Sequence, residues 1–276
     1  MELDGLVRRQ VEYRNHAFPA PGGVCSNRTN SAKLAHMRVN LGLMALSVTI
    51  SFNACMIEQR LVLGNEFSGV WTLEGRTMHF AGGVLEDLAV LGGYDNSDAF
   101  YDEALSEAIA GLEARGDVED FKIDRVGKHV WTADVEFRDI RSFLGDAALG
   151  GIADIRQDGD MYIFSLRFNH ARASELENLL PIIKEPAFSL FNPAKNEGFS
   201  EEEYITEILG FTFGEENLPE LRRAMLTLSI TVPGTVVDVE GGTKLSENSA
   251  RFEVPFTRLL VPEKEIIWLV SWRKWP

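Results

Sequence analysis

The thiol of Cys55 is the side chain whose place in the sequence most clearly indicates chemistry. It follows an uncharged, mostly apolar run over residues 39–52, and the residue before it, Ala54, is small. Lys33 and Arg38 put positive charge ahead of that run. A basic start, an apolar stretch and a small-residue cleavage site are the three parts of an export signal. We therefore expect residues 37–54 to be a signal peptide.

The four residues Phe52-Asn53-Ala54-Cys55 resemble a bacterial lipobox, at which the signal is cut before a cysteine that then carries lipid. The commonest lipobox has leucine three residues before the cysteine, whereas Phe52 and Asn53 resemble the relaxed form of spirochaete lipoproteins. The resemblance implies that Cys55 is the first mature residue and is acylated, for example with palmitate. Several acyl chains on one cysteine would anchor the protein firmly to a membrane.

Two other interpretations of the apolar run remain open. It spans about 14 residues, whereas a transmembrane helix needs about 20. A buried helix or strand is the second alternative, because residues 48–50 are β-branched, although no polar face recurs at helical or strand period. Residues 1–36 contain acidic residues, prolines and glycines, so we expect a disordered extension, or translation that starts at Met37.

Charge and hydrophobicity limit the classes of function. The chain has 27 basic and 42 acidic residues, a net charge of −15, which repels phosphate backbones and argues against nucleic-acid binding. It is 45% hydrophobic, so residues 55–276 are expected to form one globular domain. The anchor would then be the lipid on Cys55, because a negative surface does not adhere to anionic headgroups.

No catalytic or metal-binding motif stands out. The sequence lacks the common hydrolase, zinc-protease, phosphate-loop and dinucleotide signatures, and His79, His129 and His170 lie far apart. The acidic run Glu201–Glu203 follows Ser200 at an expected helix start, where carboxylates stabilise the helix dipole. We therefore expect a protein that is not an enzyme and that needs no metal or cofactor.

Alternating patterns predict an α+β fold with a mostly antiparallel sheet packed on helices. The clearest helix is Ser97–Arg115, for which Ser97 is the expected cap. The expected strands are Ile57–Leu63, Val70–Phe80, Val118–Asp124, Val130–Phe137, Ile152–Arg156, Met161–Phe168, Leu226–Val232, Val236–Val239, Arg251–Leu260 and Glu265–Trp272. Further helices are expected at Ile140–Leu149, Ala173–Lys184 and Glu201–Leu209.

The C-terminal part resembles the LppM-type domain of bacterial lipoproteins. The resemblance lies in the segments Val232-Pro233-Gly234-Thr235-Val236, Glu240-Gly241-Gly242 and Val270-Ser271-Trp272, and in the cysteine before the first strand. It covers residues 55–80 and 225–272, whereas the extra helices over Ala173–Leu209 depart from it. The family resemblance implies a helix-grip-like, lipid-binding fold in which a curved antiparallel sheet wraps a helix. Because Gly234 follows Pro233, we also expect a positive φ at Gly234.

Aromatic residues crowd into the segment Leu180–Phe213, whose prolines and asparagines suit a lid. We expect them to line an apolar cavity together with one face of the strand Met161–Phe168. The predicted ligand-binding residues are Phe188, Phe191, Tyr204, Phe211, Tyr162, Phe164 and Leu166. We expect Trp268 and Trp272 to belong to the core.

The sequence as a whole predicts an exported lipoprotein, on the periplasmic face or the cell surface, that binds a lipid or another hydrophobic molecule. Its expected partners are the membrane, through Cys55, and that ligand. The alternative is an envelope protein that binds other proteins, of unknown identity, and no small molecule. An apolar cavity would favour the first interpretation, and a solid core with an exposed apolar patch the second.

Overall fold

Alternating apolar and polar residues build two β-sheets in the part of the chain that the structure describes. This computed structural model describes residues 54–77, 86–87, 89–90, 95–126, 130–144, 152–179 and 191–275. The predicted extension over residues 1–36 and the signal up to residue 53 lie outside the described residues. Among the described residues, no helix is both long enough and apolar enough to span a bilayer.

The larger sheet has seven strands in the order β3-β4-β2-β1-β7-β10-β9. Its central pair, β1 and β7, is parallel, with Met56 opposite Met225, and the neighbouring strands pair antiparallel. The strands are β1 (Ala54–Leu63), β2 (Gly69–Thr77), β3 (Val118–Arg125), β4 (Val130–Phe137), β7 (Met225–Thr231), β9 (Gly242–Ser246) and β10 (Ser249–Pro255).

The smaller sheet has four antiparallel strands in the order β5-β6-β11-β8. These are β5 (Ala153–Asp158), β6 (Met161–Phe168), β8 (Gly234–Glu240) and β11 (Ile266–Lys274). Its apolar face packs on that of the larger sheet: Phe164, Trp268 and Val270 share one core cluster with Leu61, Val135 and Phe252. Burying these side chains on both faces is the main stabilising contribution to the pair of sheets.

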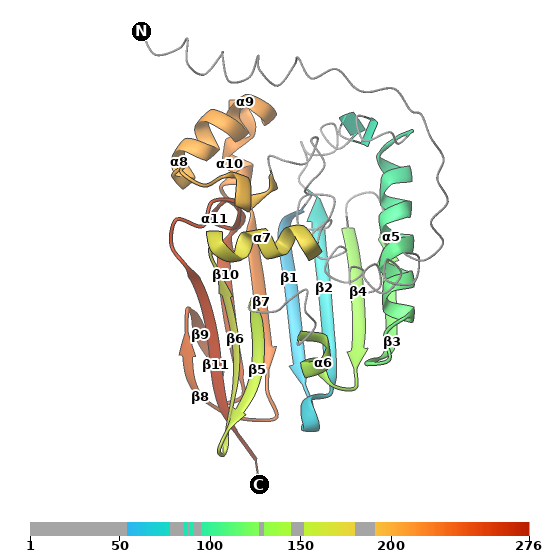
Figure 1. Cartoon of the computed structure of the whole chain (residues 1–276), viewed down its shortest axis with the longest axis vertical. Helices are drawn as coiled ribbons and strands as arrows, with labels where there is room; N and C mark the ends of the chain where they lie inside the picture. Colours follow the sequence, from blue (N-terminus) through green and yellow to red (C-terminus); the bar gives the residue numbers. More distant parts are fainter. Residues whose placement is uncertain are drawn as a thin grey trace, which may run out of the picture. The chain divides into compact units, whose positions relative to one another are not determined.

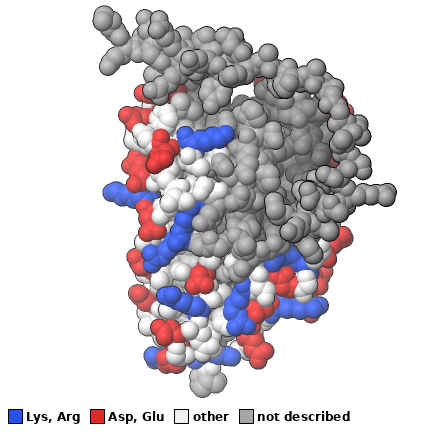
Figure 2. Space-filling model, viewed as in Figure 1, with Lys and Arg blue, Asp and Glu red and all other residues white. Residues whose placement is uncertain are grey.

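The expected α+β class with mostly antiparallel strands is confirmed. Where a single curved sheet is expected, the described residues form two sheets, and one of the passages of the chain between them is at Gly241, between β8 and β9. Trp268 and Trp272 are buried between the sheets, which confirms their predicted place in the core. On the face seen in Figure 2, acidic and basic side chains are interspersed over the described residues.

Short helices lie around the sheets (Figure 1). The longest, α5 (Ser97–Glu113), contacts β3. The others are α6 (Ile140–Leu144), α7 (His170–Leu179), α8 (Glu201–Glu203), a π-helical turn (Tyr204–Leu209), α9 (Gly210–Phe213), α10 (Leu218–Leu221) and α11 (Phe256–Leu260), with 3₁₀ turns at Asn65–Phe67, Pro193–Lys195 and Glu215–Asn217.

The cap of α5 is Asn96 and not the predicted Ser97. The Asn96 carboxamide oxygen accepts a 2.8 Å hydrogen bond from the backbone N–H of Ala99, and Ser97 is the first helical residue. The sequence offers two adjacent cap-forming residues, and the extended backbone at Asn96 decides between them.

Replacing Asn96 with alanine should therefore lower the free energy of unfolding by about 1 kcal/mol, because one N–H of the first turn loses its acceptor. Urea unfolding followed by circular dichroism measures this change. The variant Ser97→Ala is the control and should change stability by a few tenths of that amount. Equal losses in both variants would contradict the assignment of the cap.

A capping box starts the helical segment that begins at α8. The Ser200 hydroxyl accepts from the N–H of Glu203, and the Glu203 carboxylate accepts from the N–H of Ser200 at 2.9 Å. Glu202 makes two hydrogen bonds to the guanidinium of Arg222, at 2.6 and 2.7 Å. The predicted capping role of Glu201–Glu203 is confirmed, and the pKa values of Glu202 and Glu203 lie below the ordinary value because of these hydrogen bonds.

The expected strand Arg251–Leu260 is wrong in its second half. The strand β10 ends at Pro255, and Phe256–Leu260 forms α11. Proline lacks the N–H that the ladder needs, and a short apolar run does not distinguish a strand from a helix. The expected positive φ at Gly234 is also wrong. Glycine is needed there because a Cβ would overlap the carbonyl oxygen of Arg273 on the neighbouring strand.

Candidate functional site

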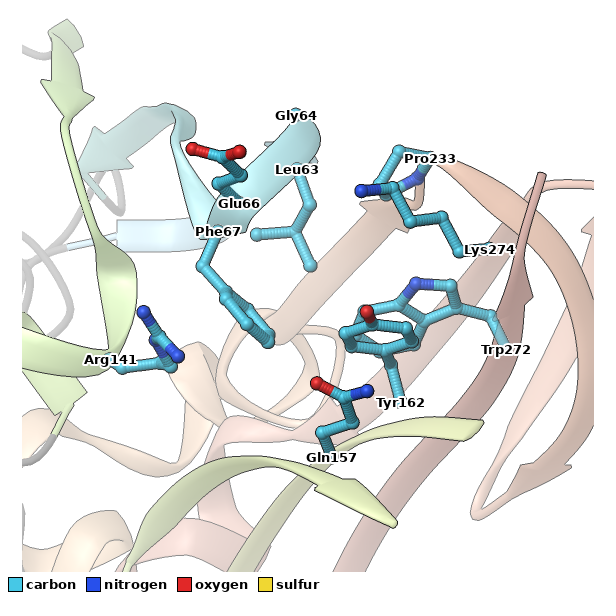
Figure 3. A pocket seen from close by; sticks show the side chains of 10 residues that line it. All are labelled: Leu63, Gly64, Glu66, Phe67, Arg141, Gln157, Tyr162, Pro233, Trp272 and Lys274. Atoms are coloured by element: carbon cyan, nitrogen blue, oxygen red, sulfur yellow. The ribbon is translucent and has the colours of Figure 1, made fainter. Parts of the chain in front are cut away.

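A cleft opens between the two sheets where β1 turns into β2. We call it the aromatic cleft, and its volume is about 310 Å³. Figure 3 shows the side chains that line it, which come from the end of β1 and its turn into β2, α6, the β5–β6 hairpin, the β7–β8 connection and the end of β11. They are Leu63, Gly64, Glu66, Phe67, Arg141, Gln157, Tyr162, Pro233, Trp272 and Lys274.

The floor of the aromatic cleft is set by strand pairing. Tyr162 on β6 lies opposite Trp272 on β11, and Gln157 on β5 lies opposite Tyr162. The Tyr162 and Trp272 rings stack, with centroids 5.6 Å apart and planes 21° apart. Trp272 is only 2% exposed, whereas Tyr162 is half-buried. Tyr162 therefore provides most of the aromatic surface by which the smaller sheet lines the cleft.

The opposite wall is the turn that joins β1 and β2. Glu66 and Phe67 have φ values of 61° and 67°, in the left-handed region that residues other than glycine seldom adopt. Such backbone costs about 1 to 3 kcal/mol per residue and is concentrated at ligand sites and switches. This turn presents the Phe67 ring to Tyr162, with the two ring centroids 5.5 Å apart. The strain is thus located in the wall of the cleft.

Arg141 holds Phe67 in this position. Its guanidinium lies 4.2 Å from the centroid of the Phe67 ring, within the range of a cation–π interaction. The same guanidinium donates from Nε and Nη2 to the carboxylate of Asp139, at 2.9 and 2.6 Å. These hydrogen bonds lower the pKa of Asp139, so the pair is charged at neutral pH. The Phe67 ring is therefore held by contacts with both Arg141 and Tyr162.

Three further polar side chains surround the aromatic rings. The Gln157 carboxamide donates to the carbonyl oxygen of Gly159 at 2.9 Å. Lys274 lies two residues after Trp272 on β11 and is exposed at the mouth of the cleft. The carboxylate of Glu66 points away from the Tyr162–Trp272 pair in Figure 3. The cleft thus combines aromatic surface with two exposed cations, of which Arg141 is paired with Asp139, an arrangement suited to binding.

The structure separates the residues that the sequence predicts as one site. Tyr162 lines the aromatic cleft, whereas Phe164 is buried in the core between the sheets and Leu166 packs against that core. Phe191 and Tyr204 are buried in a second cluster under the helical segment. Phe211 on α9 is 86% exposed, and Phe188 lies outside the described residues.

The second cluster accounts for most of the aromatic crowding in the helical segment. The Phe191 and Phe213 rings lie 6.0 Å apart, and Phe199 packs edge-on against Tyr204 at 5.9 Å. Burial raises the pKa of the Tyr204 hydroxyl, to which Asn196 is hydrogen-bonded. These rings share their buried cluster with Ile57 and Leu73 of the larger sheet. No cavity is needed to explain their number.

The sequence patterns do not identify Phe67, Arg141, Gln157 and Lys274 as residues of one cleft. Each comes from a different segment, and only the facing of the two sheets brings them together. One signal was present in the sequence: a phenylalanine in a short turn between two strands, where small polar residues are more usual.

Cys55 is the second residue of β1, so the first strand starts next to the predicted lipidation site. The pairing of β1 with β2 shifts register between Ala54 and Met56, which leaves Cys55 as the extra residue of a bulge. No group of three or more His, Cys, Asp or Glu side chains among the described residues is placed to hold a metal ion.

Comparisons with known proteins give one structural likeness. No family model matches the chain, and no curated protein matches it. Among solved structures, the chain is similar to the folded domain of LppM from Mycobacterium tuberculosis, determined by NMR. The two share 10% sequence identity with a TM-score of 0.38, over 81% of this chain and 92% of that domain. LppM is the protein whose domain type the sequence motifs resemble.

Proposed function

We propose that this chain is a lipid-anchored protein of the bacterial envelope that binds a lipid or another hydrophobic molecule in the aromatic cleft. The proposal needs no catalytic step. Export and anchoring rest on the sequence around Cys55. The helix-grip-like, lipid-binding interpretation rests on the C-terminal motifs that resemble the LppM-type domain. The observation that supports this binding site is that the rings of Phe67, Tyr162 and Trp272 line the aromatic cleft.

The volume of the cleft limits what enters it. At about 310 Å³ it lies at the lower end of the 300–1,000 Å³ range that is typical of small-molecule pockets. A whole diacyl lipid exceeds such a space. We therefore propose that a small hydrophobic molecule, or one end of a larger lipid, is the part that enters.

Replacing Tyr162 with alanine should weaken binding of the fluorescent probe N-phenyl-1-naphthylamine about five- to tenfold. The ring offers the exposed aromatic face of the cleft, and an aromatic pair contributes about 0.5 to 1.5 kcal/mol beyond its buried area. The titration uses the full chain made by cell-free synthesis without lipid-attaching enzymes.

The matched control is Phe211→Ala, which removes an aromatic ring that is 86% exposed and lies outside the cleft. It should leave the dissociation constant unchanged. If Phe211→Ala loses binding and Tyr162→Ala does not, the ligand binds at the helical segment that contains α9 and not in the aromatic cleft. If the wild-type chain binds no probe at all, the alternative of an envelope interaction protein replaces the ligand-binding proposal.

A further inference from the structure

The chemistry at the mouth of the aromatic cleft narrows the class of ligand, and this inference rests on the proposed function. The inner face of the smaller sheet is apolar along most of its length, with Ile155, Phe164 and Val270 buried. At the cleft the same face continues with Gln157 on β5 and Lys274 on β11. A change from apolar to polar side chains at one end of a buried face marks where a ligand with a polar end would lie.

Lys274 supplies the charge at this place. Among the described residues, no carboxylate lies within ion-pair distance of its ammonium group, whereas Arg273 beside it pairs with Asp160 at 2.8 Å. The other cation of the cleft, Arg141, is already paired with Asp139 and held against Phe67. Lys274 is therefore the cation that the cleft presents to an incoming molecule.

The surroundings make this cation stand out. The chain carries a net charge of −15, so its surface as a whole repels anions. The acidic side chain that lines the cleft, Glu66, is exposed and directed away from the rings in Figure 3. An anion that reaches the cleft thus meets the Lys274 ammonium near the aromatic surface of Tyr162.

We propose that the ligand is an organic acid: a flat or apolar body that lies on Tyr162 and Phe67, with one acidic group paired to Lys274. The aromatic rings would bind the flat or apolar body of the ligand by stacking, and the Lys274 ammonium would bind its acidic group through a charge-assisted hydrogen bond. A neutral hydrophobic molecule of the same shape is the weaker ligand.

Two fluorescent probes that differ by one acidic group test this selection. The anionic probe is 1-anilinonaphthalene-8-sulfonate, and N-phenyl-1-naphthylamine has the same ring system without the sulfonate. On the full cell-free chain, Lys274→Gln should weaken binding of the anionic probe about two- to fivefold, as expected for an exposed ion pair, and leave the neutral probe unchanged. Added salt should weaken only the anionic probe.

The matched control is Lys264→Gln, which removes the same charge from an exposed lysine outside the cleft. It should leave both dissociation constants unchanged. Equal effects of Lys274→Gln on the two probes, or none on the anionic one, would overturn the assignment of an acidic ligand. Tyr162→Ala separates this result from failure of the site. If Tyr162→Ala binds both probes as the wild type does, the aromatic cleft is not the binding site. If it weakens both probes while Lys274→Gln has no selective effect, the site stands and only the acidic ligand is rejected.

Discussion

Replacing Cys55 with serine is expected to abolish incorporation of a fatty-acid label and to leave the chain uncut. Lipid is attached through sulfur, and a serine hydroxyl does not provide the thiolate that reacts. The change replaces one atom in the extra residue of a bulge at the start of β1, so the fold should be retained. The expected effect is therefore all-or-none, and it is read from gel fluorescence of an alkyne-labelled fatty acid in a lipoprotein-exporting bacterial host.

The second cysteine of the chain, Cys25, offers a matched control. The variant Cys25→Ser should be labelled and cut as the wild type is, and intact mass should place the lipid on a chain that begins at Cys55. Equal labelling of Cys55→Ser and the wild type would exclude the lipoprotein proposal. The apolar run before Cys55 would then need one of its other interpretations, a membrane helix or a core element.

Replacing Gly241 with alanine should lower the free energy of unfolding by about 3 kcal/mol or more. Gly241 has a φ of +74°, which costs an L-residue about 1 to 2 kcal/mol. A Cβ at this position would also overlap the carbonyl oxygen of Ile267 and lie 3.3 Å from Cδ1 of Trp268, and overpacking adds about 1 to 3 kcal/mol. Urea unfolding followed by tryptophan fluorescence measures the loss.

Gly159 separates the two contributions. Its φ is +63°, but no atom lies within 4 Å of where a Cβ would be. Gly159→Ala should therefore cost about 1 to 2 kcal/mol, the backbone contribution alone. If both variants lose the same free energy of unfolding, the close approach of β11 to Gly241 does not contribute to the loss. The chain around Gly241 would then have room for a methyl group.

Local patterns predicted the strands well where one face is buried. Val130–Phe137 and Met161–Phe168 have the predicted bounds, because apolar residues recur at every second position of each segment. The strand β9 was missed, since each of its residues is exposed and no alternation marks it. The parallel pairing of β1 with β7 joins segments that are far apart in the chain, which no local pattern reveals.

The candidate site was harder to predict for a physical reason. Aromatic residues that are close in sequence, such as Phe191 and Tyr204, indicated a pocket but pack into a core. Tyr162, which does line the cleft, acquires its neighbours Phe67 and Trp272 only through the pairing of β6 with β11 and the facing of the sheets. A side chain that fills a core and one that lines a cleft have the same sequence pattern, and long-range packing distinguishes them.

The strand β1 has a consequence for how an anchored molecule would work. It begins beside Cys55 and ends at Leu63, which lines the aromatic cleft, so the two ends are about 27 Å apart at the rise of an extended strand. That length is about three Debye lengths at physiological ionic strength. With a lipid on Cys55 and β1 running along the membrane normal, the negative potential of the bilayer surface would be largely screened at the cleft that Lys274 lines. In that orientation, acidic headgroups of the anchoring membrane would not compete for the Lys274 ammonium, and the cleft would take its ligand from the aqueous space.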